Sequence, residues 1–278
     1  MFGIICVHST KEDGRMPLKI CISGLTAVGK TTIAQALARR YNAQYISASS
    51  LLLKLAQEHD RALGTAENIN HFWLQEKGKD LFTERERNFA LDREIDQGML
   101  SLVEASKNLI LDSLTLPYRI AEENNAFCIL LCATLKQRTD RAWLSSPTMP
   151  KYLLRKGIKE KDVRTRKILQ ALWGIDIFRP RLAKYDLIIS DGGLGKLFNH
   201  RPSANEEITI KLEIFSALLD IYVHLVEPEH IKHTMEELVE KCRQVYQRCE
   251  PIIKVFPHGF LSAENLMGIT WRLRRRGL

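Results

Sequence analysis

Short apolar segments of strand length alternate with longer segments of helical periodicity up to about residue 190. The segments that predict strands are 18–23, 44–47, 108–112, 127–132 and 186–190. Those that predict helices are 30–41, 50–58, 66–106 with one or two breaks, and 135–144. Leu109, Ile110 and Leu111 are consecutive, which is typical of a strand buried on both faces. The alternation predicts a three-layer α/β/α domain with helices on both faces of a five-stranded parallel sheet.

The pattern changes to helices alone from about Ser203. An apolar helical stripe is followed by a second helix, which begins at Thr234 with a capping-box sequence. We expect residues 203–278 to form a helical extension that packs either on the α/β domain, residues 17–200, or on another subunit in an oligomer. Residues 1–16 are interpreted as an N-terminal extension, because a second methionine directly precedes the first predicted strand.

The formal net charge of +8 indicates anionic partners, which phosphate groups alone would satisfy. The densest basic run, residues 271–276, is interpreted as a solvated tail, with a contact to nucleic acid or to an anionic membrane as the alternative. No apolar run approaches the length that spans a bilayer, and the first residues lack the basic leader of a signal peptide. The cysteines lack metal-ligand spacing and read as free thiols. We therefore expect a cytoplasmic protein without a membrane partner.

Residues 24–31 match the pattern G-x-x-x-x-G-K-[ST] between a predicted strand and a predicted amphipathic helix. Such a loop directs several backbone N–H groups to one point, and the helix adds its positive N-terminal end. The motif predicts a nucleoside triphosphate site in which Lys30 reaches the β- and γ-phosphates and Thr31 holds Mg²⁺. The residues expected to contact the triphosphate are Gly24, Leu25, Thr26, Ala27, Val28, Gly29, Lys30, Thr31 and Thr32.

Asp112 stands at the end of the third predicted strand, where it would face the phosphate loop from a neighbouring strand. There it could hold Mg²⁺ through a water or orient an acceptor phosphate, and the alternative is a cap for the next helix. Thr31 and Asp112 are therefore the expected metal-binding residues.

Residues 151–167 are rich in cations and follow a Ser- and Pro-containing segment, 145–150, that suits a hinge. The cations are Lys151, Arg155, Lys156, Lys159, Lys161, Arg164, Arg166 and Lys167. Arginines folding over the triphosphate would neutralise charge on the transferred group and exclude water. The alternative interpretation is a helix with a charged, solvated face.

Several further segments occur in one fixed order together with the phosphate loop, and together they resemble the archaeal-type cytidylate kinases within the nucleoside monophosphate kinase family. The segments are 22–24, 45–49, 55–59, 91–96, 173–177 and 185–189. The similarity extends over about residues 18–190, and the Gly174-Ile175-Asp176 segment is the most specific of its motifs. The resemblance implies a P-loop NTPase fold and transfer of the γ-phosphoryl group of ATP to CMP or dCMP, with Mg²⁺ required.

The resemblance also implies an acceptor-binding region near 47–53 and a lid over about 138–172. Arg138 and Arg141 match the basic residues with which the family's lid helix begins, and Arg164 and Arg166 lie near its second cluster. The expected catalytic residues are Lys30, Asp112, Arg164 and Arg166. The expected acceptor-binding residues are Ser47, Lys54, Asp112, Arg119, Arg138 and Arg141.

The chain departs from the family at two acceptor-side positions. Leu53 and Leu114 stand where the family commonly has arginines, one after its Ser-Ala-Gly segment and one after the third-strand acid. Each charge-assisted contact is worth about 1.5–3 kcal/mol, so losing both would weaken acceptor binding strongly. Lys54 and Arg119 are close enough in sequence to replace them. Three hypotheses follow: a cytidylate kinase, an ATP-binding regulatory or interaction protein, and a P-loop kinase for another small metabolite.

Overall fold

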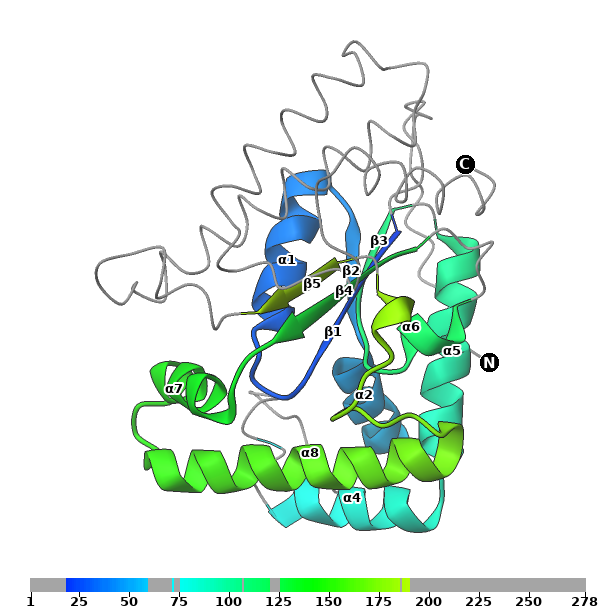
Figure 1. Ribbon diagram of the computed structural model, residues 1–278. Helices are drawn as coiled ribbons and strands as arrows, with labels where there is room; N and C mark the ends of the chain where they lie inside the picture. Colours follow the sequence, from blue (N-terminus) through cyan, green and yellow to red (C-terminus); the bar gives the residue numbers. More distant parts are fainter. Residues whose placement is uncertain are drawn as a thin grey trace, which may run out of the picture.

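The structure, a computed structural model, describes residues 19–59, 72, 76–106, 108–120, 126–185 and 187–190. The predicted N-terminal extension, the helical extension 203–278 and the basic run within it lie outside the described residues. The strands are β1 (Lys19–Gly24), β2 (Gln44–Ser47), β3 (Leu109–Asp112), β4 (Phe127–Cys132) and β5 (Leu187–Ser190). They form one sheet in the order β2-β3-β1-β4-β5, and each neighbouring pair is parallel. The predicted parallel α/β architecture is confirmed (Figure 1).

The strands alternate with helices along the chain. The longer helices are α1 (Lys30–Tyr41), α2 (Ala48–His59), α4 (Glu76–Arg87), α5 (Ala90–Ala105), α7 (Leu135–Ser145) and α8 (Lys151–Trp173). A four-residue helix, α6 (Leu116–Arg119), follows β3. The long helical segment predicted over 66–106 is interrupted at Asn88 and Phe89, where the Asn88 side chain accepts a hydrogen bond from the Ala90 N–H.

Alternate residues of the central strands point to opposite faces of the sheet and build two apolar layers. Cys21, Leu109 and Leu111 join a buried cluster to which α2 and α5 contribute their apolar faces. The helix α1 packs against β1, β2 and β3 with its buried residues, among them Ile33 and Leu37. Both faces of the sheet are therefore covered, which explains why β3 is entirely apolar up to its final aspartate.

The helices α7 and α8 pack against each other, and α8 also packs against α4. Figure 1 shows α8 running across the edge of the sheet at which the strands end. The capping box of Thr134 and Gln137 starts α7, and Gly174 ends α8 with a positive φ of 65° that suits glycine. The predicted hinge between the helices contains a turn in which the Met149 N–H donates to the Ser146 carbonyl oxygen at 3.1 Å. None of the described helices is long and apolar enough to cross a membrane.

Candidate active site

The phosphate loop between β1 and α1 has the backbone shape that an anion site requires. Ala27 and Gly29 have positive φ angles of 61° and 99°, so successive peptide groups turn their N–H groups in new directions. A Cβ at Gly24 would lie 2.5 Å from the Leu131 carbonyl oxygen, so only glycine fits there. The first turn of α1 has no side-chain cap and no acidic residue. Its first N–H groups thus remain available to a phosphate.

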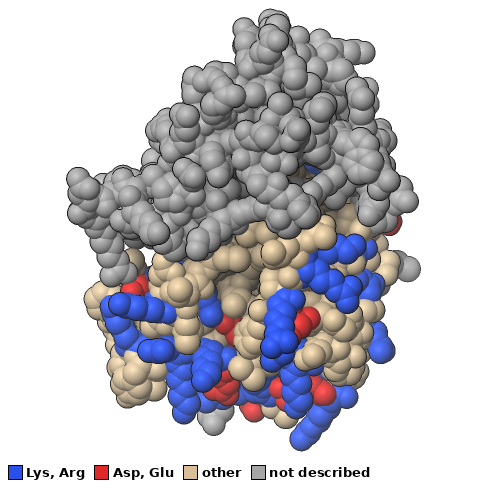
Figure 2. Space-filling view, in the orientation of Figure 1, with Lys and Arg blue, Asp and Glu red and all other residues tan. Residues whose placement is uncertain are grey.

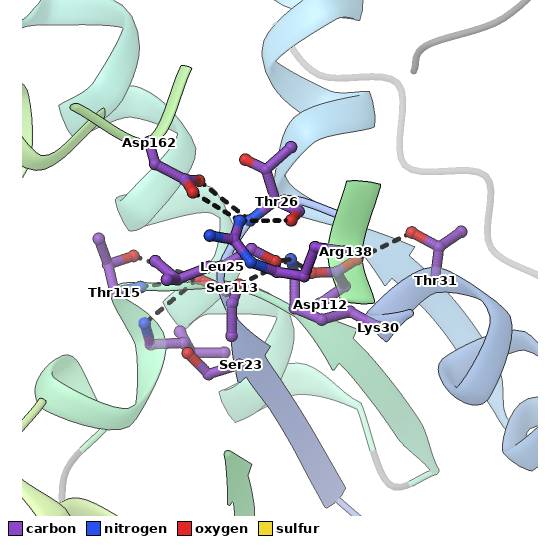
Figure 3. Close-up of polar contacts among 12 residues, drawn as sticks. Ser23, Leu25, Thr26, Lys30, Thr31, Asp112, Ser113, Thr115, Arg138 and Asp162 are labelled. Carbon is purple, nitrogen blue, oxygen red and sulfur yellow. Dashed lines mark hydrogen bonds and ion pairs between the residues drawn. The ribbon is translucent and has the colours of Figure 1, made fainter. Parts of the chain in front are cut away.

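Lys30, Thr31 and Asp112 come together at the carboxyl edge of the sheet (Figure 3). The Lys30 ammonium donates to the carbonyl oxygens of Gly24 at 2.8 Å and Leu25 at 3.3 Å, and lies 3.9 Å from Asp112 Oδ1. The Thr31 hydroxyl donates to Asp112 Oδ2 at 3.1 Å. A hydroxyl and a carboxylate are hard oxygen ligands of the kind that Mg²⁺ uses beside substrate phosphates. The donor set at Thr31 and Asp112 therefore fits the implied metal ion.

A buried ion pair attaches α8 to the phosphate loop. Arg138 Nη1 donates to Asp162 Oδ2 at 2.6 Å and to the Thr26 carbonyl oxygen at 2.8 Å. The Thr26 N–H in turn donates to Asp162 Oδ1 at 3.1 Å, as Figure 3 shows. Arg138 and Asp162 are only 5% and 3% exposed, so solvent screens this pair little. Asp162 could not be recognised from the sequence, because a carboxylate within a basic run resembles a surface residue.

A cavity of about 460 Å³ extends from the phosphate loop along the carboxyl ends of β2 and β3 to the first two turns of α5. This volume lies in the ordinary range for small-molecule sites. The phosphate loop lines one side, from Thr26 to Thr32, and helices α7 and α8 lie along the cavity. The polar residues on the opposite side include Tyr45, Ser47, Arg85, Asp92, Asp96 and Asp112. We call the phosphate loop, residues 24–31, together with Asp112 the donor side, because Asp112 contacts Lys30 and Thr31. The other polar residues just given form the acceptor side.

The acceptor side contains a buried ion pair between Arg85 of α4 and Asp92 of α5. Arg85 Nε donates to Asp92 Oδ2 at 3.0 Å, and Nη2 donates to Oδ1 at 2.6 Å. The guanidinium also lies 5.0 Å from the centre of the Phe82 ring. Arg85 could not be recognised from the sequence because its neighbours are mostly charged, although Asp92 belongs to segment 91–96 of the family resemblance.

Asp96 lies one turn after Asp92 and also lines the cavity. The Thr115 hydroxyl donates to Asp96 Oδ1 at 2.6 Å, while the buried Oδ2 atom accepts no hydrogen bond from any residue that the structure describes. Burial raises the pKa of Asp96, and the Thr115 hydrogen bond opposes that shift. The pKa of Tyr45 is also raised, mainly by burial and then by the negative charge of Asp112.

Lys161 is the lysine of α8 that lines the cavity. Burial lowers its pKa to about 7, and the positive charge of Lys30 adds to this effect while Asp162 opposes it. The charges of Arg85 and Asp112 also act on it, so Lys161 lies within electrostatic reach of both sides of the cavity. From the sequence alone, Lys161 was one of eight cations in residues 151–167, and nothing marked it as the one that lines the cavity.

Most other cations of α8 face outward. Lys151, Arg155, Lys156, Lys159 and Lys167 are exposed. Figure 2 shows lysines and arginines, interspersed with acidic residues, across the coloured surface, which includes the part where α7 and α8 lie in Figure 1. These five exposed residues agree with the alternative interpretation of this segment, a helix with a charged face in solvent.

The two arginines predicted to be catalytic point away from the cavity in this arrangement. Arg164 Nε donates to Glu86 Oε1 at 2.8 Å and Nη2 donates to the Thr83 hydroxyl at 2.9 Å, both on α4. Arg166 forms two hydrogen bonds with Asp176, at 2.8 and 2.6 Å. The guanidinium groups therefore attach α8 to its neighbours, and neither residue lines the described cavity.

Some of the predicted acceptor-binding residues line the cavity and others do not. Ser47 and Arg141 line the cavity, and Arg141 donates to the Val28 carbonyl oxygen at 3.3 Å. Lys54 is exposed on α2 and is not among the described cavity residues. Arg119 stacks on Trp173 with its guanidinium carbon 3.6 Å from the ring centre, also outside the cavity lining. Neither suggested replacement for the missing arginines reaches the cavity.

The loop, its helix and the carboxylate of the neighbouring strand define a P-loop protein with a phosphate-binding site. A glycine-rich turn with this lysine, threonine and aspartate arrangement is the site at which such proteins hold a nucleotide and Mg²⁺. The class of protein is therefore established by local geometry.

A sequence model described as the cytidylate kinase-like family matches residues 19–192, and the chain belongs to this family. The chain is 26% identical over 202 residues to a cytidylate kinase of Methanocorpusculum labreanum, covering 73% of this chain and 98% of that protein. It is 25% identical over 175 residues to a cytidylate kinase of Sulfurisphaera tokodaii, covering 63% and 87%. The predicted resemblance is confirmed, and family membership supports a phosphotransferase with a nucleotide substrate.

A solved structure of shikimate kinase from Bacteroides thetaiotaomicron is similar to this chain with a TM-score of 0.40 and 18% identity. The similarity covers 73% of this chain and 98% of that one. A TM-score of this size carries no argument about the acceptor of this chain.

Proposed function

We propose that the protein is a nucleoside monophosphate kinase that transfers the γ-phosphoryl group of ATP to CMP or dCMP. The observation that carries the proposal is the meeting of Lys30, Thr31 and Asp112 at one end of a cavity that continues to a separate polar region. A phosphotransferase needs two adjoining sites of this kind, one for the donor and one for the acceptor. The cytidylate kinases among the relatives support the pyrimidine acceptor.

The donor triphosphate would bind along the loop and the N-terminus of α1. The Lys30 ammonium, now held by two loop carbonyl oxygens, would exchange these neutral partners for charged phosphate oxygens, which are stronger acceptors. Thr31 and Asp112 would hold Mg²⁺, which neutralises charge on the phosphates when it is bound. Phosphoryl transfer requires little covalent work from the protein, so positioning and electrostatic stabilisation provide the rate enhancement.

The cations that line the cavity would neutralise the negative charge of the phosphoryl group during its transfer. Lys161 is within electrostatic reach of both Lys30 and Arg85, so its charge acts between the donor and the acceptor side. Arg141 lies beside the loop at Val28, close to the donor phosphates. In this proposal Lys161 and Arg141 would take the role that we predicted for Arg164 and Arg166.

A coupled assay for ADP production tests the proposal, with ATP, Mg²⁺ and a panel of CMP, dCMP, UMP, AMP and GMP as acceptors. We expect turnover to be highest with CMP or dCMP. Protein that binds ATP and yet transfers phosphate to no pyrimidine monophosphate would contradict the cytidylate assignment. Adding shikimate and gluconate to the panel separates this outcome from a kinase for another small metabolite.

A second candidate is an ATP-binding regulatory or interaction protein. The specific observation in its favour is that apolar residues occupy both expected arginine positions, since Leu53 is buried in the core and Leu114 is half-buried. ATP binding by calorimetry together with no turnover on the complete panel is the result that favours this candidate.

A further inference from the structure

The acceptor side lacks the two arginines that the family resemblance leads one to expect. Leu53 is 5% exposed and packs in the core of the sheet domain, and Leu114 packs near Leu169 and Ile175. The suggested replacements, Lys54 and Arg119, lie outside the cavity lining. A doubly charged acceptor phosphate would therefore need a cation from another part of the fold.

Arg85 is a cation on the acceptor side that is still able to donate. A guanidinium has five N–H groups in a fixed plane. Asp92 takes one from Nε and one from Nη2, which leaves three. Nη1 has no hydrogen-bond partner among the described residues, and Arg85 lines the cavity although it is only 6% exposed. Arg85 therefore combines a place in the cavity lining with N–H groups that no described residue uses.

The partner of Arg85 fixes its position. Asp92 is 7% exposed and holds the guanidinium through two hydrogen bonds, while the Phe82 ring lies against it at 5.0 Å. An arginine fixed in this way loses little rotamer entropy when it binds a ligand, because its side chain is already ordered. The ion pair also explains how α4 can supply a buried cation without leaving an unpaired charge.

We propose that Arg85 binds the phosphate group of the acceptor, with Asp92 as its positioning residue, in place of the arginines absent at Leu53 and Leu114. The inference rests on the proposed function, because it requires that the acceptor carry a phosphate. Acceptor binding would then take place where α4 and α5 meet and not at α2, the helix that carries Leu53.

Calorimetric binding of CMP and of cytidine to the Arg85→Met variant tests the assignment. We expect the affinity for CMP to fall about 10- to 100-fold, as for one lost charge-assisted contact, and the affinity for cytidine to stay within about twofold. The affinity for ATP should be unchanged. Arg87→Met is the matched control, since Arg87 is an exposed arginine two residues further along α4, and it should bind both ligands like the wild type.

Removing Arg85 leaves Asp92 buried without its partner, so the single variant could unfold. Arg85→Met combined with Asp92→Asn removes both charges and provides a second folded comparison, with the same loss expected for CMP. The positioning role of Asp92 predicts that Asp92→Asn alone raises the KM for CMP and leaves the KM for ATP and kcat unchanged. Asp92→Glu should recover part of this loss.

Two results distinguish the failure of this inference from the failure of the proposed function. If wild-type protein binds CMP and the Arg85 variants bind it equally well, or lose CMP and cytidine in equal measure, only the assignment of Arg85 is overturned. If wild-type protein binds no nucleoside monophosphate at all, both proposals are overturned.

Discussion

The donor and acceptor sides of the cavity are built in different ways. The donor side consists of eight consecutive residues, 24–31, together with Asp112 on the adjacent strand, and it uses mainly backbone groups. The acceptor side takes its polar side chains from β2, α4 and α5. A backbone site is preserved as long as the loop keeps its shape, whereas a site made of side chains changes with each substitution. The difference explains how the chain can keep donor recognition while its acceptor contacts diverge.

The donor side is also constrained from outside the loop. Gly24 cannot be enlarged because of the Leu131 carbonyl oxygen, and Thr26 is bound through both its N–H and its carbonyl group. On the acceptor side, Asp96 and Tyr45 have buried oxygens without hydrogen-bond partners in the described part of the chain. Unsatisfied buried polar atoms are costly unless a ligand completes them. Both sides therefore keep polar groups that a substrate could complete, on the donor side the first N–H groups of α1 and on the acceptor side these two oxygens.

Lys30→Ala should have the largest effect on catalysis. The ammonium is the expected contact to the transferred phosphoryl group, so turnover should fall at least about 10²- to 10³-fold. The initial rate in the coupled assay measures the loss. Lys136→Ala, which removes an exposed lysine of α7, is the control and should retain the wild-type rate. Unchanged turnover in folded Lys30→Ala protein would contradict the donor-side assignment.

Arg138→Met tests the attachment of α8 to the phosphate loop. The variant leaves Asp162 buried without its partner, so the free energy of unfolding should fall by about 3–5 kcal/mol. Thermal unfolding by circular dichroism measures the change, with Arg155→Met on the exposed face of α8 as the control. Arg138→Met combined with Asp162→Leu should recover much of the loss. A single variant as stable as the wild type would show that the ion pair does not attach the helix.

Lys161→Arg tests whether the charge of Lys161, which acts on both sides of the cavity, controls the pH dependence of activity. Because burial and the charge of Lys30 lower the pKa of Lys161 to about 7, its positive charge is present below that pH and lost above it. Arginine remains charged throughout. We expect kcat/KM of the wild type to fall about fivefold between about pH 7 and pH 8, and that of the variant to stay level. A parallel fall in both proteins would assign the titration to another group.

Arg164→Met and Arg166→Met should have the smallest effects. Both guanidinium groups are bound to partly exposed carboxylates outside the cavity, Glu86 and Asp176, and such pairs contribute within about 1 kcal/mol. We expect kcat to stay within about threefold of the wild type in the coupled assay. A loss of about 100-fold or more in either variant would show that the sequence prediction of catalytic arginines was right for the closed enzyme.

Much of the fold could be predicted because local patterns determine it. The consecutive apolar residues of β3 and the strand, loop and helix order around Gly24 specify buried parallel strands without reference to distant residues. The predicted bounds of α1, 30–41, agree with the observed helix because a glycine at its start and an αL residue, Asn42, at its end mark it. The phosphate loop was recognisable for the same reason.

The acceptor side could not be predicted because it depends on how helices pack. Arg85 and Asp92 lie on either side of the break between α4 and α5, and their pairing follows from the turn at Asn88. Cations occur on every face of α8, so their spacing does not reveal which face meets α4 and which meets the cavity. That is why Lys161 was not distinguished from Arg164, three residues further along the helix.

Asp162, which binds the phosphate loop, is the middle residue of the 23-residue helix α8. A helix of this length extends over about 35 Å, and this one is fixed at its centre. The Arg164 and Arg166 contacts hold the helix again further along, on α4 and at Asp176. Because Asp162 accepts from the Thr26 N–H and also pairs with Arg138, one carboxylate positions α7, α8 and the phosphate loop together. A substitution at Asp162 should therefore disturb three walls of the cavity at once.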